Sequence, residues 1–104
     1  MKKIQLDIPK DEIALFCRQN HVRKLALFGS ILREDFREDS DVDILVEFEP
    51  GYVPGFIALY SLEEKLKTFF PGHEVDLVTE KFLNHRIRHQ VLAEAKIQYE
   101  AAHA

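Results

Sequence analysis

The segment 42–48 constrains the fold more than any other, because its side chains alternate between two kinds. One set is apolar and the other begins with carboxylates: the first is Val42, Ile44, Val46 and Phe48, and the second is Asp41, Asp43, Leu45 and Glu47. A two-residue repeat predicts a strand with one buried face. Asp41 and Asp43 would then point to the same side, roughly 6.5–7 Å apart along the chain.

The rest of the chain divides into short regular segments. An apolar run at 23–28 ends at Gly29 and predicts a buried strand, and 74–78 predicts another short strand. Helical spacing is found in four segments, which are 9–20, 31–37, 56–70 and 83–99. The order α-β-α-β-α-β-α predicts a small α/β domain, residues 1–104, with helices packed on a three-strand sheet.

Composition limits the possible partners and the compartment. The net charge of −4 argues against general nucleic-acid binding, which needs a basic face. We expect no membrane span and no secretory leader, because the apolar runs are short and the first residues lack an apolar stretch. The single cysteine, Cys17, fits a reducing compartment and reads best as a small buried apolar residue, so we expect a cytoplasmic protein.

The aspartates point to metal-dependent phosphate chemistry. Carboxylates two residues apart on one strand face can share divalent ions, and phosphoryl-transfer sites hold two ions about 3.5–4 Å apart. Mg²⁺ prefers a few carboxylates together with phosphate oxygens and water. Asp76, in Val75-Asp76-Leu77-Val78, would complete the acidic set if its strand lies beside that of Asp43.

Gly29 and Ser30 suit the phosphate half of such a site. Glycine lets a backbone approach a phosphate closely. Ser30 precedes a predicted helix, so its hydroxyl and the next amides would form an anion-binding helix start. Arg33 lies about one turn further and could pair with a phosphate oxygen.

Other interpretations of these residues are weaker. The run Asp39-x-Asp41-x-Asp43 is not a calcium loop, because Ile44 replaces the required glycine and Pro50 the required glutamate. No Gly-Lys-Ser/Thr follows the first strand, so there is no P-loop. His85 and His89 have a zinc-binding spacing, but a solvated helix face explains them better. Glu47 shares the aspartate face and is either a group outside the metal shell or an exposed strand residue.

The combination resembles the DNA polymerase β-like nucleotidyltransferase superfamily. Gly29-Ser30, ten residues, then Asp41-Val42-Asp43 looks like its signature, and the likeness covers nearly the whole chain. With Val75-Asp76-Leu77-Val78 and a closing helix at Glu94-Ala95, the chain is similar to the minimal nucleotidyltransferases of prokaryotes. The resemblance implies a polymerase β-like nucleotidyltransferase fold, α/β (α+β), with a small mixed sheet of three or more strands.

The resemblance also implies roles and a reaction. The implied catalytic and metal-binding residues are Asp41, Asp43 and Asp76, with two Mg²⁺ ions. The implied nucleotide-binding residues are Gly29, Ser30 and Arg33. Relatives commonly occur beside a HEPN-domain toxin, and the implied reaction transfers AMP from ATP to a tyrosine of that partner. This chain would then be the antitoxin of the pair.

Two other functions stay open from the sequence. A binding module would neutralise its partner by covering it, without catalysis. Nucleotide transfer to a small molecule is the third possibility, but no substrate-binding domain is evident in the chain. The sequence does not fix the acceptor, the base preference or the oligomeric state.

Overall fold

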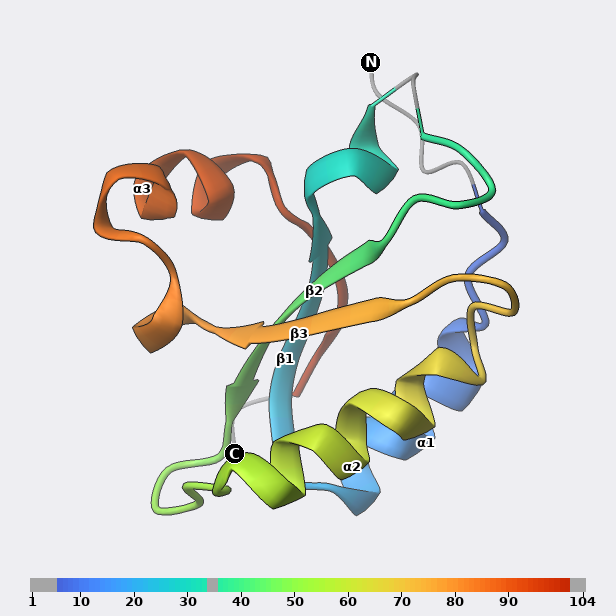
Figure 1. Cartoon of the computed structure of the whole chain (residues 1–104). Coiled ribbons are helices and arrows are strands. Elements are labelled where there is room, and N and C mark those ends of the chain that lie inside the picture. Colours follow the sequence, from blue (N-terminus) through green and yellow to red (C-terminus); the bar gives the residue numbers. More distant parts are fainter. Residues whose placement is uncertain (1–5, 34–35, 102–104) are drawn as a thin grey trace.

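A four-stranded sheet with three α-helices makes up this protein, seen in a computed structural model that describes residues 6–33 and 36–101 (Figure 1). The α-helices are α1 (Lys10–Gln19), α2 (Phe56–Lys67) and α3 (His85–Glu94). The strands are β1 (Val22–Phe28), β2 (Val42–Phe48), β3 (Val75–Thr79) and β4 (Lys96–Glu100). Two short 3₁₀ turns complete the described chain, η1 (Gly29–Leu32) and η2 (Glu80–Phe82). Within these ranges no helix is both long enough and apolar enough to cross a bilayer.

The sheet is mixed, with strand order β3-β2-β1-β4. β1 pairs antiparallel with both β2 and β4, whereas β2 and β3 run parallel. The parallel pair is joined through α2, as a crossover between parallel strands requires. β2 is therefore an inner strand with β3 beside it at one edge of the sheet.

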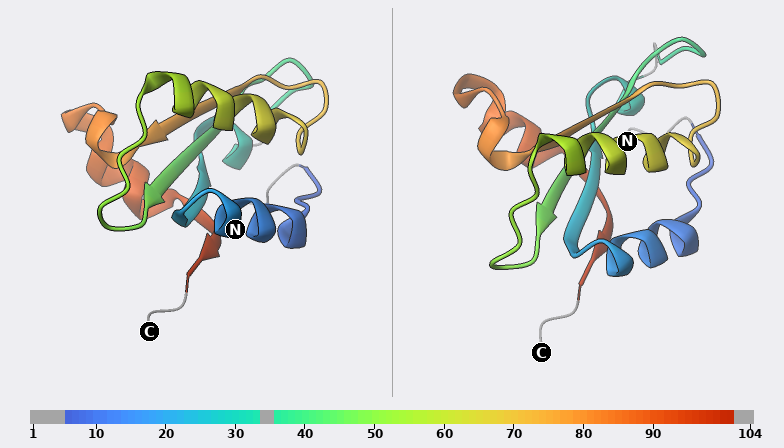
Figure 2. Two further views of the ribbon diagram at one scale, coloured as in Figure 1. Left: turned by 90° about the horizontal axis from the view of Figure 1, so that it is seen from below. Right: turned by 60° about the horizontal axis from the view of Figure 1, so that its bottom comes forward.

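The core lies on one face of this sheet, beneath α1 and α2 (Figures 1 and 2). Alternate residues of β2 point into it, and Val42, Ile44 and Val46 are buried there. Leu62 and Leu66, one turn apart on α2, pack against them. The opposite face of β2 carries Asp43, Leu45 and Glu47, so the alternation predicted from the sequence is confirmed.

Helix α1 shows why its sequence forms an amphipathic helix. Ile13, Phe16 and Cys17 occupy one stripe and are buried, while acidic residues in the first turn and Arg18 in the last suit the helix dipole. Burial raises the pKa of the Cys17 thiol to about 12. Cys17 therefore packs as an uncharged apolar residue, as predicted.

Most predicted elements are confirmed to within a few residues, and two are wrong. The helix predicted over 83–99 ends at Glu94, and residues 96–99 belong to β4. Ala95 is extended, with ψ 139°, which ends the helix and lets the next residues pair with β1.

The helix predicted over 31–37 is also wrong. A single 3₁₀ turn spans Gly29–Leu32, and Arg33 is extended with φ −105° and ψ 154°. Residues 34–35 of that prediction lie outside the described residues, as does the chain start at 1–5 on which the expectation of no leader depends.

Candidate active site

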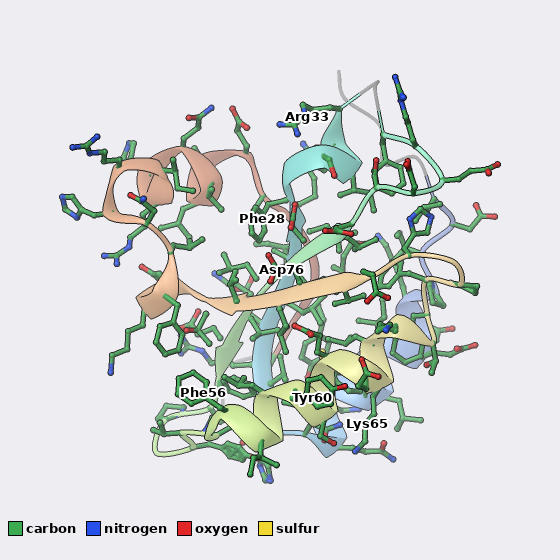
Figure 3. All side chains as sticks on the ribbon, in the orientation of Figure 1. Phe28, Arg33, Phe56, Tyr60, Lys65 and Asp76 are labelled. Carbon is green, nitrogen blue, oxygen red and sulfur yellow. The ribbon has the colours of Figure 1, made fainter. Side chains whose placement is uncertain are left out.

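The parallel pairing of β2 and β3 places two of the predicted aspartates together. Asp43 and Asp76 are direct Cα partners across the two strands. Their neighbours Val42 and Val75 are buried, so both carboxylates leave the sheet on the face opposite α1 and α2. Asp76 is exposed on the edge strand, and Figure 3 shows it beside the β3 ribbon, on the side away from α2.

The turn after β1 lies directly against Asp43. Gly29 has φ +75°, a conformation that favours glycine, and a Cβ added to it would lie 2.3 Å from Asp43 Oδ2. The Ser30 backbone N–H donates to the Asp43 carboxylate. Phe28 is the Cα partner of Asp43 in the antiparallel ladder, which fixes this contact. The pairing of β1 with β2 therefore brings Gly29-Ser30 to the acids.

Asp41 stands just before β2 and is exposed. The Ser30 hydroxyl donates to the Asp41 carbonyl oxygen at 3.1 Å, which holds the start of β2 against η1. His73 holds the same region from the side of β3, because its Nδ1 lies 2.7 Å from the Ser40 carbonyl oxygen and its ring stacks on Phe36. The sequence pattern gave no reason to assign this role to His73.

The electrostatics of Asp43 reflect first its partial burial and then the acids around it. Partial burial raises the pKa of the Asp43 carboxyl, and the negative charges of Asp76 and then Asp41 raise it further. The Ser30 backbone N–H and the Arg33 guanidinium act in the opposite direction but do not cancel the rise in pKa. A cation placed among the three acids would relieve this repulsion.

The residues present fit a divalent metal that is shared with a substrate. In the described part of the chain, no three His, Cys, Asp or Glu side chains form a ready-made metal cluster. Mg²⁺ commonly takes only one or two protein carboxylates and completes its shell with phosphate oxygens and water. The paired carboxylates lie on adjacent strands, repel one another and are open on one side. They therefore match an ion that takes its other ligands from phosphate and water.

A pocket of about 320 Å³ opens beside the acids, between η1 and α3. Its polar wall contains four of the predicted site residues, namely Gly29, Ser30, Arg33 and Asp43. Its other wall is formed by Phe28 and by one face of α3, which supplies Ile87, Gln90, Val91 and Glu94. These α3 residues were not predicted as part of the site, because their helical spacing looks like ordinary packing. Arg33, labelled in Figure 3, is exposed and lines the pocket from extended backbone.

The structure places three further residues that the sequence singled out. Glu47 shares the aspartate face, but its carboxylate pairs with Arg23 of β1. His85 and His89 lie on α3 and do not line the pocket.

The prediction that Ser30 begins a helix is wrong, because only a 3₁₀ turn follows it and not a long helix with a dipole. The contribution of this segment is confined to its hydroxyl and local amides.

Comparison with known proteins agrees with this geometry. The sequence model of the nucleotidyltransferase domain family matches residues 10–98. Protein adenylyltransferase MntA of Thermococcus cleftensis is 44% identical over 73 residues, which cover 70% of this chain and 71% of that protein.

Solved structures share the fold. A structure described as a minimal nucleotidyltransferase superposes with a TM-score of 0.66 and 36% identity, covering 83% of this chain and 85% of that one. A complex of the tri-AMPylated HEPN toxin of Shewanella oneidensis with MNT antitoxin gives a TM-score of 0.63 at 24% identity, covering 88% of this chain and 70% of that one. The chain belongs to the nucleotidyltransferase domain family and is a nucleotidyltransferase.

Proposed function

We propose that this protein transfers AMP from ATP onto a tyrosine hydroxyl of a HEPN-domain partner toxin and so neutralises it as an antitoxin. The observation that carries the proposal is the pairing of Asp43 with Asp76 directly beside the Gly29-Ser30 turn. The adenylyltransferase activity named for the Thermococcus relative and the AMPylated toxin in the Shewanella complex support the choice of donor and acceptor. ATP as donor also suits a cytoplasmic protein.

The pocket beside Asp43 is the proposed site for the nucleotide. Gly29 and Ser30 would bind the triphosphate, because both line this pocket and the amides of their turn can donate to phosphate oxygens. The Ser30 hydroxyl would then turn from the Asp41 carbonyl oxygen to a phosphate oxygen. Arg33 would pair with a phosphate oxygen from the same wall. The opposite wall is partly apolar, and Ile87 and Val91 would pack against the flat face of the base.

The three aspartates would bind the metal ions, and one of them would also accept a proton. Asp41, Asp43 and Asp76 would hold Mg²⁺, two ions by the family pattern, which supply positive charge to the triphosphate and the leaving pyrophosphate. Asp76 would accept the proton of the acceptor hydroxyl. The acceptor oxygen forms a bond to the α-phosphorus as the bond from that phosphorus to the α,β-bridging oxygen breaks. AMP then remains on the tyrosine and pyrophosphate departs.

The experiment uses two radiolabelled forms of ATP with Mg²⁺ and, as the partner, a HEPN-domain protein from the same genome. Label on the α-phosphate should appear on the partner, and label on the γ-phosphate should not. Mass spectrometry of the labelled partner should place AMP adducts on tyrosine. Transfer of the γ-label, or no transfer to the partner, contradicts the proposal.

Neutralisation by binding alone is the second candidate. It is favoured by the large exposed apolar side chains of α2, the loop before it and η2, which are Val53, Phe56, Ile57, Tyr60 and Phe82. The two functions differ in their need for the acids. If the chain acts only by binding, a variant with Asp41, Asp43 and Asp76 all changed to Asn should still protect cells from the toxin.

A further inference from the structure

We propose that the acceptor protein docks along the β3 edge of the sheet, on a surface formed by Phe56, Tyr60, Glu63, Leu77 and Phe82. We call this set the β3-edge surface. The inference rests on the proposed function, and it specifies from which side the acceptor reaches the acids. Its occupant is a protein with apolar anchor side chains, and with basic residues near the acceptor hydroxyl.

The two sides of the acidic centre are not equivalent. On the β1 side, Asp43 meets Gly29, η1 and the pocket whose far wall is α3. On the other side lies β3, which is an edge strand, and Asp76 on it is exposed. A nucleotide in the pocket leaves the β3 side open. An acceptor hydroxyl that must reach Asp76 therefore approaches across the β3 edge.

Apolar side chains gather along this same edge. Phe56 is 81% exposed, Tyr60 is 63% exposed and Phe82 is 60% exposed. The rings of Phe56 and Phe82 stack with centroids 6.3 Å apart, which connects the start of α2 to η2. Figure 3 shows Phe56 and Tyr60 on α2, below the β3 ribbon. Contiguous exposed aromatic residues of this kind mark interaction surfaces.

A shallow pocket of about 300 Å³ lies within this surface. Phe56, Tyr60 and Phe82 line it together with Leu77 and Val78 of β3. A cavity of this size accepts one large apolar side chain, the usual form of an anchor in a protein interface.

The surface lies around the edge of β3 from the acidic centre. Asp76 leaves the sheet on the face opposite α2, whereas the next residue, Leu77, packs towards α2 and lines the pocket. A partner that wraps around this edge strand would contact both. A typical interface buries about 800 Å² on each partner, which is wide enough to cover both the aromatic residues and Asp76.

Hydrogen bonding and charge indicate what kind of partner fits. The Leu77 backbone N–H donates to Glu63 Oε2 at 3.1 Å, so this edge amide is already satisfied. The partner therefore binds mainly through side chains and not by adding a strand to the sheet. Glu63, Asp76 and Glu80 make the margin acidic, which favours basic residues on the partner.

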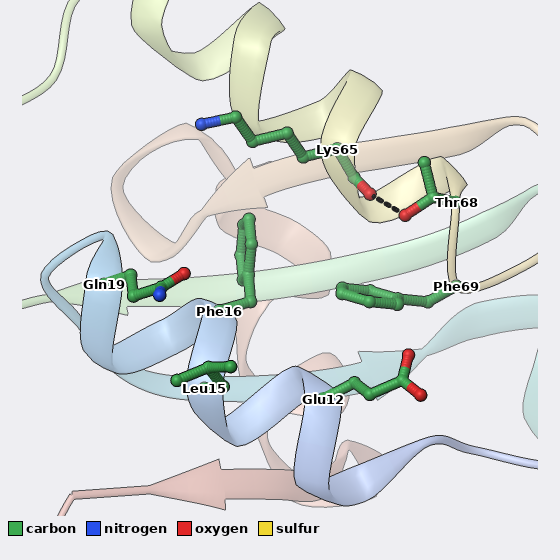
Figure 4. A pocket seen from close by; sticks show the side chains of 7 residues that line it. All are labelled: Glu12, Leu15, Phe16, Gln19, Lys65, Thr68 and Phe69. Atoms are coloured by element: carbon green, nitrogen blue, oxygen red, sulfur yellow. Dashed lines mark hydrogen bonds between the residues drawn. The ribbon is translucent and has the colours of Figure 1, made fainter.

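A second groove supplies a matched control. A pocket of about 370 Å³ between α1 and α2 is lined by Leu15, Phe16, Lys65 and Phe69 among others (Figure 4). It lies between the two helices and contains no residue of β3 or η2, so a protein bound there would not reach the acids around the β3 edge. Leu15 is 50% exposed in it and can be changed without disturbing the core.

The test measures AMP transfer to the HEPN protein by Phe56→Glu/Tyr60→Glu and by Leu15→Glu. The double variant should raise KM for the partner protein at least about 10-fold with kcat nearly unchanged, because anchor contacts dominate such interfaces. Its affinity for AMP-PNP should match wild type, which shows that the variant is folded. Leu15→Glu should leave both constants unchanged, and Phe82→Ser should repeat the effect of the double variant.

The outcomes separate this inference from the proposed function. The partner could bind wild type and protect α2 and β3 from hydrogen exchange without receiving AMP. That result would support the docking surface and contradict the proposed reaction. If AMP moves and the double variant keeps the wild-type KM, the docking surface is wrong. The docking surface is also wrong if Leu15→Glu raises KM instead, or if the double variant only converts a dimer of this chain into monomer.

Discussion

Asp43 and Asp76 are Cα partners on adjacent parallel strands, so their carboxylates leave the sheet at the same level and on the same face. On its other side, Asp43 pairs with Phe28, the residue before Gly29. Three distant segments of sequence thus meet at one carboxylate. The partners on both sides of Asp43 are set by backbone pairing and not by flexible side chains, which suits a site that must position phosphate groups accurately.

Asp43→Asn should stabilise the metal-free protein. The pKa of Asp43 lies above its ordinary value of 3.8, chiefly because the group is partly buried and next because of Asp76 and Asp41. The folded state therefore binds this proton more tightly than the unfolded state, and ionised Asp43 lowers the stability above its folded pKa. Removing the charge should raise Tm at neutral pH by about 2–5 °C.

The stabilisation by Asp43→Asn should depend on pH. As pH falls from the folded-state pKa of Asp43 towards 3.8, Asp43 takes up its proton, and wild type should regain the stability that the ionised carboxylate costs. Asp43→Asn carries no such cost at any pH. The gap in Tm between the two proteins should therefore close on acidification and reach a plateau at higher pH. Thermal unfolding followed by circular dichroism from about pH 4 to about pH 8 measures it. An equal or lower Tm for Asp43→Asn at neutral pH would show that neither burial nor the neighbouring acids make ionised Asp43 appreciably unfavourable in the folded protein.

Mg²⁺ with AMP-PNP should raise the Tm of wild type, because a ligand that binds only the folded state stabilises it. At a concentration about 100 times its Kd the gain is about 2.7 kcal/mol. The gain should vanish with EDTA and shrink strongly in Asp43→Asn. Asp39→Asn, a change to an exposed acid in the loop before β2, should keep the full gain. Equal gains in all three proteins would place the metal elsewhere.

Gly29→Ala should abolish transfer for two separable reasons. An alanine at φ +75° is strained by about 1–2 kcal/mol, and its Cβ would lie 2.3 Å from Asp43 Oδ2. Displacement of that carboxylate should reduce kcat/KM at least about 100-fold.

Gly51→Ala is the matched control for this change. Gly51 has φ +86° but no atom within 4 Å of an added Cβ, so the variant carries the backbone strain without the clash. Its Tm should fall by the effect of the strain alone, and so by less than that of Gly29→Ala, while its activity per folded molecule stays at the wild-type level. If both variants lose activity equally, strain and not the contact with Asp43 accounts for the loss.

Ile87→Ser should weaken nucleotide binding. Ile87 lines the pocket and is 46% exposed, whereas Leu92 on the same helix is 43% exposed and does not line it. Loss of one partly buried apolar contact should raise KM for ATP about 3–10-fold, and Leu92→Ser should leave it unchanged. Steady-state kinetics over a range of ATP concentrations measures the difference. Similar KM values for ATP in the two variants would show that this face of α3 does not contribute to nucleotide binding.

The extent to which the sequence predicts this fold depends on the range of the interactions. Val42–Phe48 and Lys10–Gln19 were predicted well, because their periodicity over seven to ten residues reports one buried face. Residues 96–99 were wrongly assigned to a helix, because Ala95 and Tyr99 continue a four-residue spacing. Strand β4 forms through pairing with β1, a long-range interaction that local spacing does not contain.

The same contrast between local patterns and long-range contacts applies to the site. The three aspartates and Gly29-Ser30 could be selected from local patterns, and the contact between Gly29 and Asp43 supplies a reason for the glycine that the sequence only suggested. The regular helix expected after Ser30 was wrong, because Arg33 is already extended. His73 and the α3 wall of the pocket could not be predicted, since a tertiary contact places each of them.

The most direct test of the account compares the acids in a single-turnover assay with α-labelled ATP, Mg²⁺ and the HEPN protein. Wild type and the loop control Asp39→Asn should label the partner at the same rate. Asp41→Asn, Asp43→Asn and Asp76→Asn should each label it at least about 100-fold more slowly while remaining folded. Labelling at the wild-type rate by Asp43→Asn would contradict the central claim, because Asp43 joins the Gly29-Ser30 turn to Asp76.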